Sequence, residues 1–182
     1  MDRLWAGWRS AYIDGVTGAD TADEPGGSVF TRILASGLPD DDTHIVWRGE
    51  TIFAVLNRYP YTSGHVLVMP YREVADLEAL TADEHTELFG AVVAAVTAVK
   101  AAYSPHGVNV GFNLGEAAGA GVPGHLHAHV LPRWSADSNF MTAVAETRVL
   151  PEPLDRTWEK LRAAWPSRSA RPGPSGPPAK PA

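Results

Sequence analysis

One short run constrains the local structure of this 182-residue chain more than any other: His125, His127 and His129 alternate with Leu126 and Ala128. In an extended strand successive side chains point to opposite faces, so the three histidines share one face and the apolar residues face the core. Each imidazole has two ring nitrogens that need partners, so three adjacent rings are costly without a purpose. Because imidazole titrates close to neutral pH, the run indicates a base, an acid or a nucleophile.

Residues 115–124, directly before the histidine run, contain four glycines. Glycine lets backbone amides approach an anion closely, so such a loop can hold phosphate oxygens without Lys or Arg. Phosphoryl and nucleotidyl transfer depend mainly on positioning and on charge stabilisation. A loop of amides followed by a strand of imidazoles has the parts that this chemistry requires.

Two other interpretations of the histidine run stay open at this point. Alternating histidines can chelate Zn²⁺ or Fe²⁺, although a cupin-like site would usually need a carboxylate a few residues further on. The next acidic residues after His129 are Asp137, which lies beyond Pro132, and Glu146. The other interpretation is three satisfied histidines on an exposed strand.

Five strand-like segments predict an α+β fold with a largely antiparallel sheet of about five strands. They occupy residues 44–48, 51–56, 65–69, 108–114 and 126–131. Gly49-Glu50 separates the first two segments and predicts a hairpin turn. One long helix and a C-terminal helix accompany the sheet, without the regular strand–helix alternation of a parallel α/β fold.

The clearest predicted helix begins at the capping-box sequence Thr81-Ala-Asp-Glu84 and runs to about Tyr103. Its apolar residues recur at three-four spacing and predict one buried stripe: Leu88, Phe89, Val92, Val93, Val96 and Val99. Helices are also expected at residues 29–35 and 154–165. We therefore divide the chain into an N-terminal arm and loop (1–27), a folded domain (28–165) and a disordered Pro-rich tail (166–182).

The composition narrows the classes of function. The chain has no cysteine, which excludes disulfides, thiolate zinc sites and cysteine nucleophiles. A net charge of −6 argues against broad nucleic-acid binding, which needs a basic face. No apolar stretch is long enough to cross a bilayer, and the first residues lack the apolar core of a signal peptide. We therefore expect no membrane partner and a cytoplasmic location.

Three segments together carry a specific resemblance to a known family. Gly64-His65-Val-Leu-Val-Met-Pro70, Asn113-Leu-Gly115 and His125-Leu-His-Ala-His-Val-Leu-Pro132 resemble the histidine triad (HIT) nucleotide hydrolases and transferases in order and spacing. The resemblance covers roughly residues 48–132. Leu4-Trp-Ala-Gly-Trp-Arg9, the Asn57-Arg-Tyr-Pro-Tyr61 turn and the segment after Pro132 are most similar to the bacterial diadenosine tetraphosphate phosphorylase branch.

The resemblance implies a catalytic role for four histidines. His127 matches the nucleophile that attacks the α-phosphorus and carries the nucleotidyl group as a phosphoramidate. His129 matches the residue that contacts the phosphate and assists the leaving group. His125 and His65 match a pair that hydrogen-bond to one another and hold the strand and the site in register.

The resemblance also implies substrate-binding positions. Asn57 matches a ribose contact, and Asn113 matches a polar group near the phosphates. Gly119 and Gly121 lie where the family has its phosphate-binding loop. Many relatives carry a Gln-Ser pair in that loop, whereas this chain has Ala120-Gly121 and one additional residue. Backbone contacts to phosphate therefore become more important here.

Some bacterial relatives bind structural zinc through an upstream pair of cysteines. Ser28 and Thr31 stand at those positions in this chain, so we expect no such zinc and no other metal site. No obligate cofactor is implied, although Mg²⁺ can accompany the substrate phosphates. The resemblance further implies a homodimer.

These observations predict a nucleotidyl transferase that cleaves dinucleoside polyphosphates through a nucleotidyl-histidine intermediate. Diadenosine tetraphosphate plus inorganic phosphate would give ADP plus ATP. One alternative is a hydrolase of the same family that acts on dinucleoside polyphosphates or nucleoside phosphoramidates with water as the acceptor. A second alternative, from another class, is a non-catalytic regulatory module that binds nucleotides in the same pocket.

Overall fold

The computed structural model describes residues 27–135, 137 and 152–167, and most of the expected arm and tail lie outside this part. Its centre is a five-stranded sheet with the order β1-β2-β3-β5-β4, in which all neighbouring strands are antiparallel. The strands are β1 (Ile45–Arg48), β2 (Ile52–Leu56), β3 (Val66–Pro70), β4 (Gly107–Phe112) and β5 (Ala128–Arg133). The predicted α+β class and the antiparallel sheet are confirmed.

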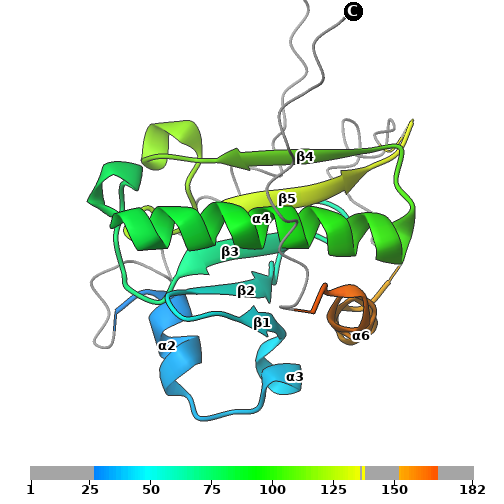
Figure 1. The fold of residues 1–182 in the computed structure, drawn as a ribbon, viewed down its shortest axis with the longest axis horizontal. Helices are drawn as coiled ribbons and strands as arrows, with labels where there is room; N and C mark the ends of the chain where they lie inside the picture. Colours follow the sequence, from blue (N-terminus) through cyan, green and yellow to red (C-terminus); the bar gives the residue numbers. More distant parts are fainter. Residues whose placement is uncertain (1–26, 136, 138–151, 168–182) are drawn as a thin grey trace, which may run out of the picture.

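The helices lie on both sides of this sheet. They are α2 (Val29–Ala35), α3 (Asp40–Thr43), α4 (Ala82–Tyr103) and α6 (Leu154–Ala164), with 3₁₀ turns η1 (Leu77–Ala79) and η2 (Glu116–Ala118). In Figure 1 the long helix α4 crosses the sheet, and α6 lies near its β1 edge. The predicted capping box is present at the start of α4, because the side chains of Thr81 and Glu84 each accept a hydrogen bond from the other residue's backbone amide.

The strands bury side chains on both faces, and the two faces carry different clusters. On the α4 side the strands contribute a cluster that includes Ala54, Leu56, Val66, Val68, Ala128 and Val130. On the opposite side the second cluster consists of Phe30, Ile45, Phe53, Val55, Leu67 and Met69. This division follows the two-residue alternation of a strand, and it places the α2 face next to the histidine run.

The predicted apolar stripe of α4 is only partly correct. Leu88, Val92 and Val99 are buried, but Phe89 and Val93 are 53% and 65% exposed. The buried positions are completed instead by three small residues, Ala91, Ala95 and Ala98. Phe89 and Val93 lie on a flank of the helix that faces outward beside β4, where the Phe89 and Phe112 rings are 6.4 Å apart. The helix therefore presents an apolar flank as well as a buried face.

Contrary to the sequence-based expectation, α4 is long and apolar enough to cross a bilayer by length and composition, and 33% of the qualifying stretch is buried. A single helix of this kind is weak evidence, because the core helix of a soluble protein passes the same test. Here α4 packs against β2, β3, β5 and α6, which is the arrangement of a core helix.

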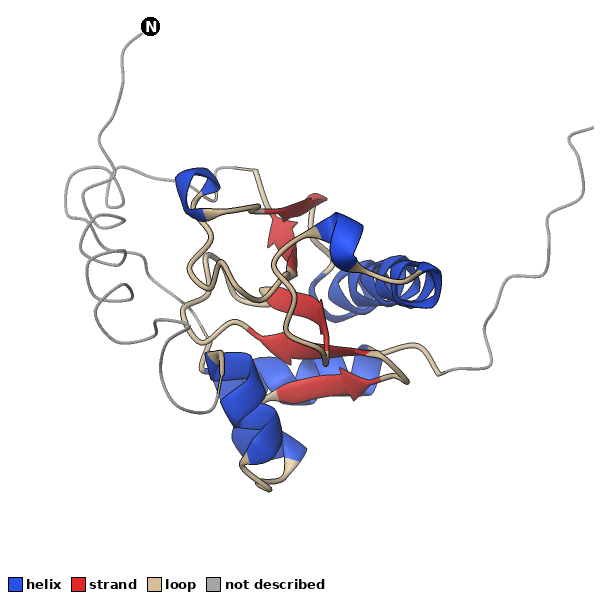
Figure 2. Ribbon diagram, turned by 90° about the vertical axis from the view of Figure 1, so that its left-hand side faces the viewer, coloured by secondary structure: helices blue, strands red, loops and turns tan. Residues whose placement is uncertain are grey.

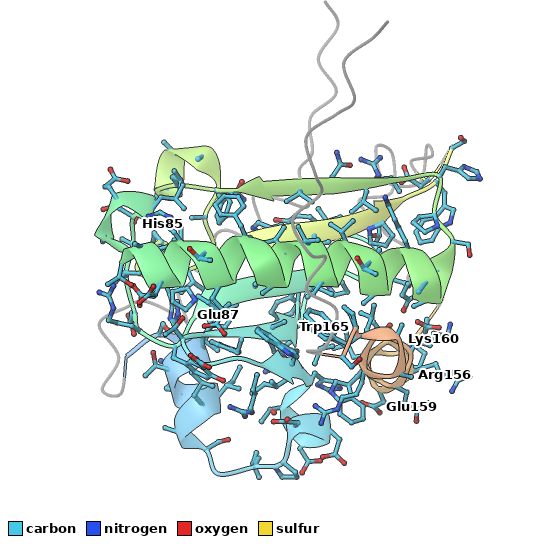
Figure 3. The ribbon with its side chains drawn as sticks, in the orientation of Figure 1. His85, Glu87, Arg156, Glu159, Lys160 and Trp165 are labelled. Carbon is cyan, nitrogen blue, oxygen red and sulfur yellow. The ribbon has the colours of Figure 1, made fainter. Side chains whose placement is uncertain are left out.

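The predicted Gly49-Glu50 turn is held against α4 by one carboxylate. Glu87 accepts hydrogen bonds from the amides of Glu50 and Thr51, at 2.8 and 2.7 Å. Figure 3 labels Glu87 on α4 beside these strands, and Trp165 at the end of α6 over β1, where its ring stacks on Trp47 at 5.8 Å. These contacts tie the helix layer to the β1–β2 hairpin.

Candidate active site

A pocket of about 750 Å³ lies on the face of the sheet opposite α4, and both His127 and His129 line it. Figure 2 shows α4 to the right of the strands and α2 at their lower left. Apolar side chains from α2, β2, β3 and the glycine loop form much of its wall: Val29, Phe30, Ile33, Val55, Leu67 and Val122. The histidines therefore stand at the polar end of a largely apolar cavity, as in many small-molecule sites.

His127 has the geometry of a neutral nucleophile. Its Nδ1 lies 2.7 Å from the carbonyl oxygen of His125, and because a carbonyl only accepts, Nδ1 must carry the proton. The lone pair is then on Nε2. Burial lowers the pKa of His127, although the hydrogen bond to the His125 carbonyl opposes this effect. The ring, 7% exposed, is therefore neutral at neutral pH and able to attack an electrophile.

His129 receives its tautomer from His65. The amide of Tyr61 donates to His65 Nδ1 at 3.2 Å, so the His65 proton is on Nε2. That nitrogen lies 2.9 Å from His129 Nδ1 and donates to it. A neutral His129 then carries its own proton on Nε2, and its ring is stacked on Tyr61 at 6.0 Å. His129 can therefore donate a hydrogen bond or a proton to an oxygen bound in the pocket.

The hydrogen bond that the resemblance implied between His65 and His125 is wrong. The register pairs Leu67 with His129, so His65 lies at the His129 end of the strand pair and bonds His129 instead. His125 lies at the other end, where its Nε2 donates to the carbonyl of Pro70 at 2.8 Å. The predicted common face is correct for His127 and His129, whose rings are 4.9 Å apart, whereas His125 lies in a bend before β5.

A buried group of polar side chains surrounds His125 outside the pocket. Ser28 Oγ is 2.7 Å from His125 Nδ1 and 3.1 Å from Thr31 Oγ1. Glu73 accepts from the Ser28 amide at 2.9 Å and from the Thr31 hydroxyl at 2.8 Å. Sequence reasoning singled out Ser28 and Thr31 only as replacements for cysteines, and it missed Glu73. No local pattern could have found Glu73, because it is far from Ser28 in the sequence.

Of the predicted substrate-binding residues, Asn57, Gly119 and Gly121 line the pocket. Asn57 Oδ1 accepts from the Tyr59 amide at 2.9 Å, and its Nδ2 is 3.3 Å from His65 Nδ1. Asn113 is not among the lining residues. Its amide group donates to the Gly119 carbonyl at 3.2 Å and so holds the glycine loop closed. This bond joins Asn113 to a residue that lines the pocket, and its place near the phosphates stays a prediction.

The glycine loop differs from the expected open cradle of amides. The Gly119 amide donates to Glu116 at 2.8 Å, and the amides of Ala118 and Ala120 donate to Gly115. Gly119 has φ +89°, which ends the η2 turn in the left-handed region that glycine favours. Three amides of the loop are thus used internally, and fewer remain for an anion than the glycine count suggested.

Several residues of the pocket were not predicted as site residues. Arg32 of α2 and Arg58 of the turn after β2 both line it, and they bring positive charge into a protein of net charge −6. Tyr61 stacks on His129, as described above. Arg58 and Tyr61 belong to the Asn57–Tyr61 turn, which was therefore the available signal. Arg32 could not be found, because an arginine on a short helix has no distinguishing pattern.

Comparisons with known proteins agree with this geometry. The chain matches the family model described as HIT domain over residues 39–136. It is 40% identical to the AP-4-A phosphorylase of Mycobacterium tuberculosis over 170 residues, and this alignment covers 91% of this chain and 85% of the relative. It is 37% identical over 95 residues to the asymmetrical bis(5'-nucleosyl)-tetraphosphatase of Schizosaccharomyces pombe, over 52% of each chain. The crystal structure of a Zn-bound histidine triad family protein from Mycobacterium smegmatis has the same fold, with a TM-score of 0.60 and 24% identity over 75% of this chain and 91% of that one.

The side chains of this protein do not fit a structural zinc ion of the kind that the cysteine pair would hold. Structural zinc is bound by thiolate, imidazole and carboxylate ligands, whereas Ser28 and Thr31 offer hydroxyls. The His125 Nδ1 lone pair already accepts a hydrogen bond from Ser28. Within the described ranges, no group of three or more His, Cys, Asp or Glu side chains is placed to hold a metal.

Proposed function

Because this chain belongs to the HIT domain family, we propose that it is a nucleotidyl transferase that cleaves dinucleoside polyphosphates. The reaction proposed is the phosphorolysis of diadenosine tetraphosphate to ADP and ATP. The observation that carries the proposal is the fixed tautomer of His127, whose Nδ1 proton is held by the His125 carbonyl at 2.7 Å. That bond leaves the Nε2 lone pair available at the wall of the pocket.

In the first step His127 Nε2 attacks the α-phosphorus of the substrate. A P–N bond forms, and the bond between this phosphorus and the bridging oxygen breaks, which releases ATP and leaves AMP on the histidine. Charge develops on the leaving oxygen, and His129 supports it by donating from Nε2. The His65–His129 hydrogen bond of 2.9 Å keeps that proton directed away from His65.

In the second step an oxygen of inorganic phosphate attacks the same phosphorus. The P–N bond breaks, His127 recovers its lone pair, and AMP leaves joined to phosphate as ADP. Splitting the reaction into two displacements replaces one difficult step by two easier ones. Water as the acceptor would release AMP instead of ADP. We favour phosphate because the phosphorylase relative matches 91% of the chain and the tetraphosphatase 52%.

The pocket has the chemical division that such a substrate needs. Its apolar wall, which includes Phe30 and Leu67, suits a nucleobase. Arg32 and Arg58 suit the polyphosphate, and Asn57 suits the ribose. No obligate metal is proposed, and Mg²⁺ accompanies the substrate phosphates.

We also propose that the enzyme is a cytoplasmic homodimer. β4 is an edge strand of the sheet, and its Val110 is 48% exposed. Phe89 and Val93 of α4 extend this surface beside the edge. An open edge next to an apolar flank is a hazard that proteins normally cover. A second copy related by a two-fold axis would pair the two β4 edges and bury both flanks, since such an interface is self-complementary.

A product assay tests the proposed function. Purified protein is incubated with diadenosine tetraphosphate, with and without inorganic phosphate, and the nucleotides are separated by anion-exchange chromatography. ADP and ATP in equal amounts, formed only with phosphate, are the expected result. AMP and ATP without phosphate dependence would instead establish a hydrolase. Tight AMP binding without turnover of any dinucleotide would establish a regulatory binding module.

A further inference from the structure

The polar side chains around His125 form a connected hydrogen-bond network that the proposed reaction does not use directly. Ser28 and His125 are 2% and 0% exposed, so their polar atoms depend on protein partners. Thr31 and Glu73 complete the group from α2 and from the segment after β3. A buried network of this kind fixes its members firmly when every member is satisfied.

The direction of each hydrogen bond follows from the chemistry of the partners. His125 Nε2 must donate to the Pro70 carbonyl, so its Nδ1 is an acceptor and Ser28 Oγ donates to it. Ser28 Oγ in turn accepts from the Thr31 amide at 3.2 Å. The Thr31 hydroxyl donates to Glu73, because a carboxylate only accepts. The network therefore holds His125 in one neutral tautomer.

The backbone next to this network is shaped to admit the carboxylate. Gly27 has φ +80°, and a Cβ at this position would lie 2.8 Å from Glu73 Oε2. Any larger residue would therefore push Glu73 away from the Ser28 amide. Arg32 donates to the Gly27 carbonyl at 2.9 Å and holds this turn in place. The hydrogen bonds to Ser28 also lower the pKa of Glu73, so the carboxyl is ionised at neutral pH.

The network reaches the nucleophile through the backbone of His125. His125 is fixed at both ring nitrogens, and its own carbonyl accepts the Nδ1 proton of His127. Phe30 contacts both rings, with centroid distances of 5.4 Å to His125 and 5.5 Å to His127. Without the Ser28 hydrogen bond, only the Pro70 contact would hold the His125 ring by a polar group. The backbone at His125 could then shift, and its carbonyl would no longer hold the Nδ1 proton of His127 in one position.

We propose that Ser28 and Glu73 are positioning residues that hold His125, and through it His127, by hydrogen bonds alone. Ser28 and Thr31 stand where the resemblance implies the cysteine pair of zinc-binding relatives. The hydroxyl–carboxylate network thus replaces a metal. The kinetic consequence rests on the proposed function, whereas the tautomer and the metal content do not. Removing a residue that orients a functional side chain by a hydrogen bond, without itself touching the substrate, typically lowers activity about 10- to 100-fold.

The kinetic test compares Ser28→Ala with Thr86→Ala, which removes an exposed hydroxyl on α4. We expect kcat for the dinucleotide to fall about 10- to 100-fold in Ser28→Ala while KM changes less than about 2-fold, because the pocket wall is unchanged. Thr86→Ala should leave both constants unchanged. Glu73→Gln keeps an oxygen that can accept the hydrogen bond from the Ser28 amide, so it should retain most of the native activity, whereas Glu73→Ala should not. Unchanged kcat in both Ser28→Ala and Glu73→Ala would overturn the proposal.

A second measurement does not depend on turnover. The ¹⁵N shifts of the imidazole rings report the tautomer of each histidine, and the native protein should show His125 protonated on Nε2 and His127 on Nδ1. A purely structural role for Ser28 would lower thermal stability without changing the His127 tautomer. We expect Ser28→Ala to show a mixture of His127 tautomers, and a single unchanged tautomer would count against the proposal.

A third measurement concerns the metal itself. The native chain should contain no zinc after purification, and Ser28→Cys/Thr31→Cys should bind about one zinc ion per chain, with His125 and Glu73 as further ligands. Thr97→Cys/Lys100→Cys has the same spacing on the exposed face of α4 and should bind none tightly. Stoichiometric zinc in the native protein, or none in the Ser28→Cys/Thr31→Cys protein, would overturn the idea of a metal-free replacement. If the native protein cleaves no dinucleotide, the proposed function fails, but the tautomer and zinc results still decide this inference.

Discussion

Replacing His127 by glycine should remove the step in which a bond to phosphorus forms. The ring is held by a 2.7 Å hydrogen bond to the His125 carbonyl and lies between Phe30 and His129, at centroid distances of 5.5 and 4.9 Å. A nucleophile fixed in this way corresponds to an effective concentration of about 10⁵ M or more, or roughly 7 kcal/mol of the barrier. His129 and the phosphate contacts remain in the variant, so we expect part of the rate acceleration to survive. The value of kcat/KM should fall about 10⁴-fold, which corresponds to a barrier higher by ~5.5 kcal/mol.

The fold should tolerate this replacement, since the His127 ring lines a pocket. We expect a loss of about 1–2 kcal/mol in the free energy of unfolding, which corresponds to a Tm decrease of roughly 2–8 °C for a protein of this size. Added imidazole should restore part of the activity of His127→Gly by occupying the space of the missing ring. The matched control is His85→Ala, a histidine that Figure 3 labels on α4.

The assay follows ADP and ATP release from diadenosine tetraphosphate, and a parallel experiment traps radiolabelled AMP on the protein by denaturation in alkali. The native protein and His85→Ala should both carry label, and His127→Gly should carry none. The reasoning would be refuted if His127→Gly kept more than about a tenth of the native kcat/KM while folded. Label that persisted on the variant would refute it equally.

Three further predictions concern pH, helix capping and assembly. Burial lowers the pKa of His127 below its usual 6.5, so kcat/KM should begin to fall with decreasing pH only below pH 6.5. Burial also lowers the pKa of His125 in the folded protein, so the unfolded chain takes up protons at a higher pH than the folded one. The Tm should therefore decrease as the pH falls from 6.5. The hydrogen bond from Arg72 lowers the pKa of Glu84 to about 2, and Glu84→Ala removes both this ion pair and the capping box. We expect the free energy of unfolding to fall by about 1–2 kcal/mol and the Tm by roughly 2–8 °C, with a smaller change in Asp83→Ala. Val93→Glu should convert the proposed dimer to a monomer in analytical ultracentrifugation, and an unchanged dimer would exclude the α4 flank from the interface.

The parts of the fold that were predictable from sequence are those set by local geometry. The common face of His127 and His129 follows from strand alternation, although β5 itself begins only at Ala128. The start of α4 follows from the Thr81–Glu84 capping box, whose two hydrogen bonds join residues three apart. In each case the two residues are only two or three positions apart in the chain, so local backbone geometry fixes their distance and the residue types identify the structure.

The errors arise where the answer depends on distant chain. Three-four spacing gives the apolar faces of α4, but not which of two adjacent flanks the sheet covers. Here the sheet covers the flank of Ala91 and Ala95, and Phe89 and Val93 face outward. The resemblance implied only that Asn113 lies near the phosphates, and it gave no sign that the Asn113 side chain bonds the Gly119 carbonyl across the loop. Both outcomes are set by tertiary packing.

The assignment of the nucleophile shows the same limit at the level of single protons. Four histidines share similar burial and lie within a few residues of one site, so composition and spacing cannot rank them chemically. His125 and His65 each use both ring nitrogens in hydrogen bonds, and His129 takes a bond from His65 at Nδ1 and so keeps its proton on Nε2. Of these four histidines, His127 alone combines an Nδ1 proton held by a backbone carbonyl with an Nε2 lone pair that is available at the pocket. The carbonyls of His125 and Pro70 thus decide the chemistry, and because every residue has a carbonyl, only their positions in the fold distinguish them.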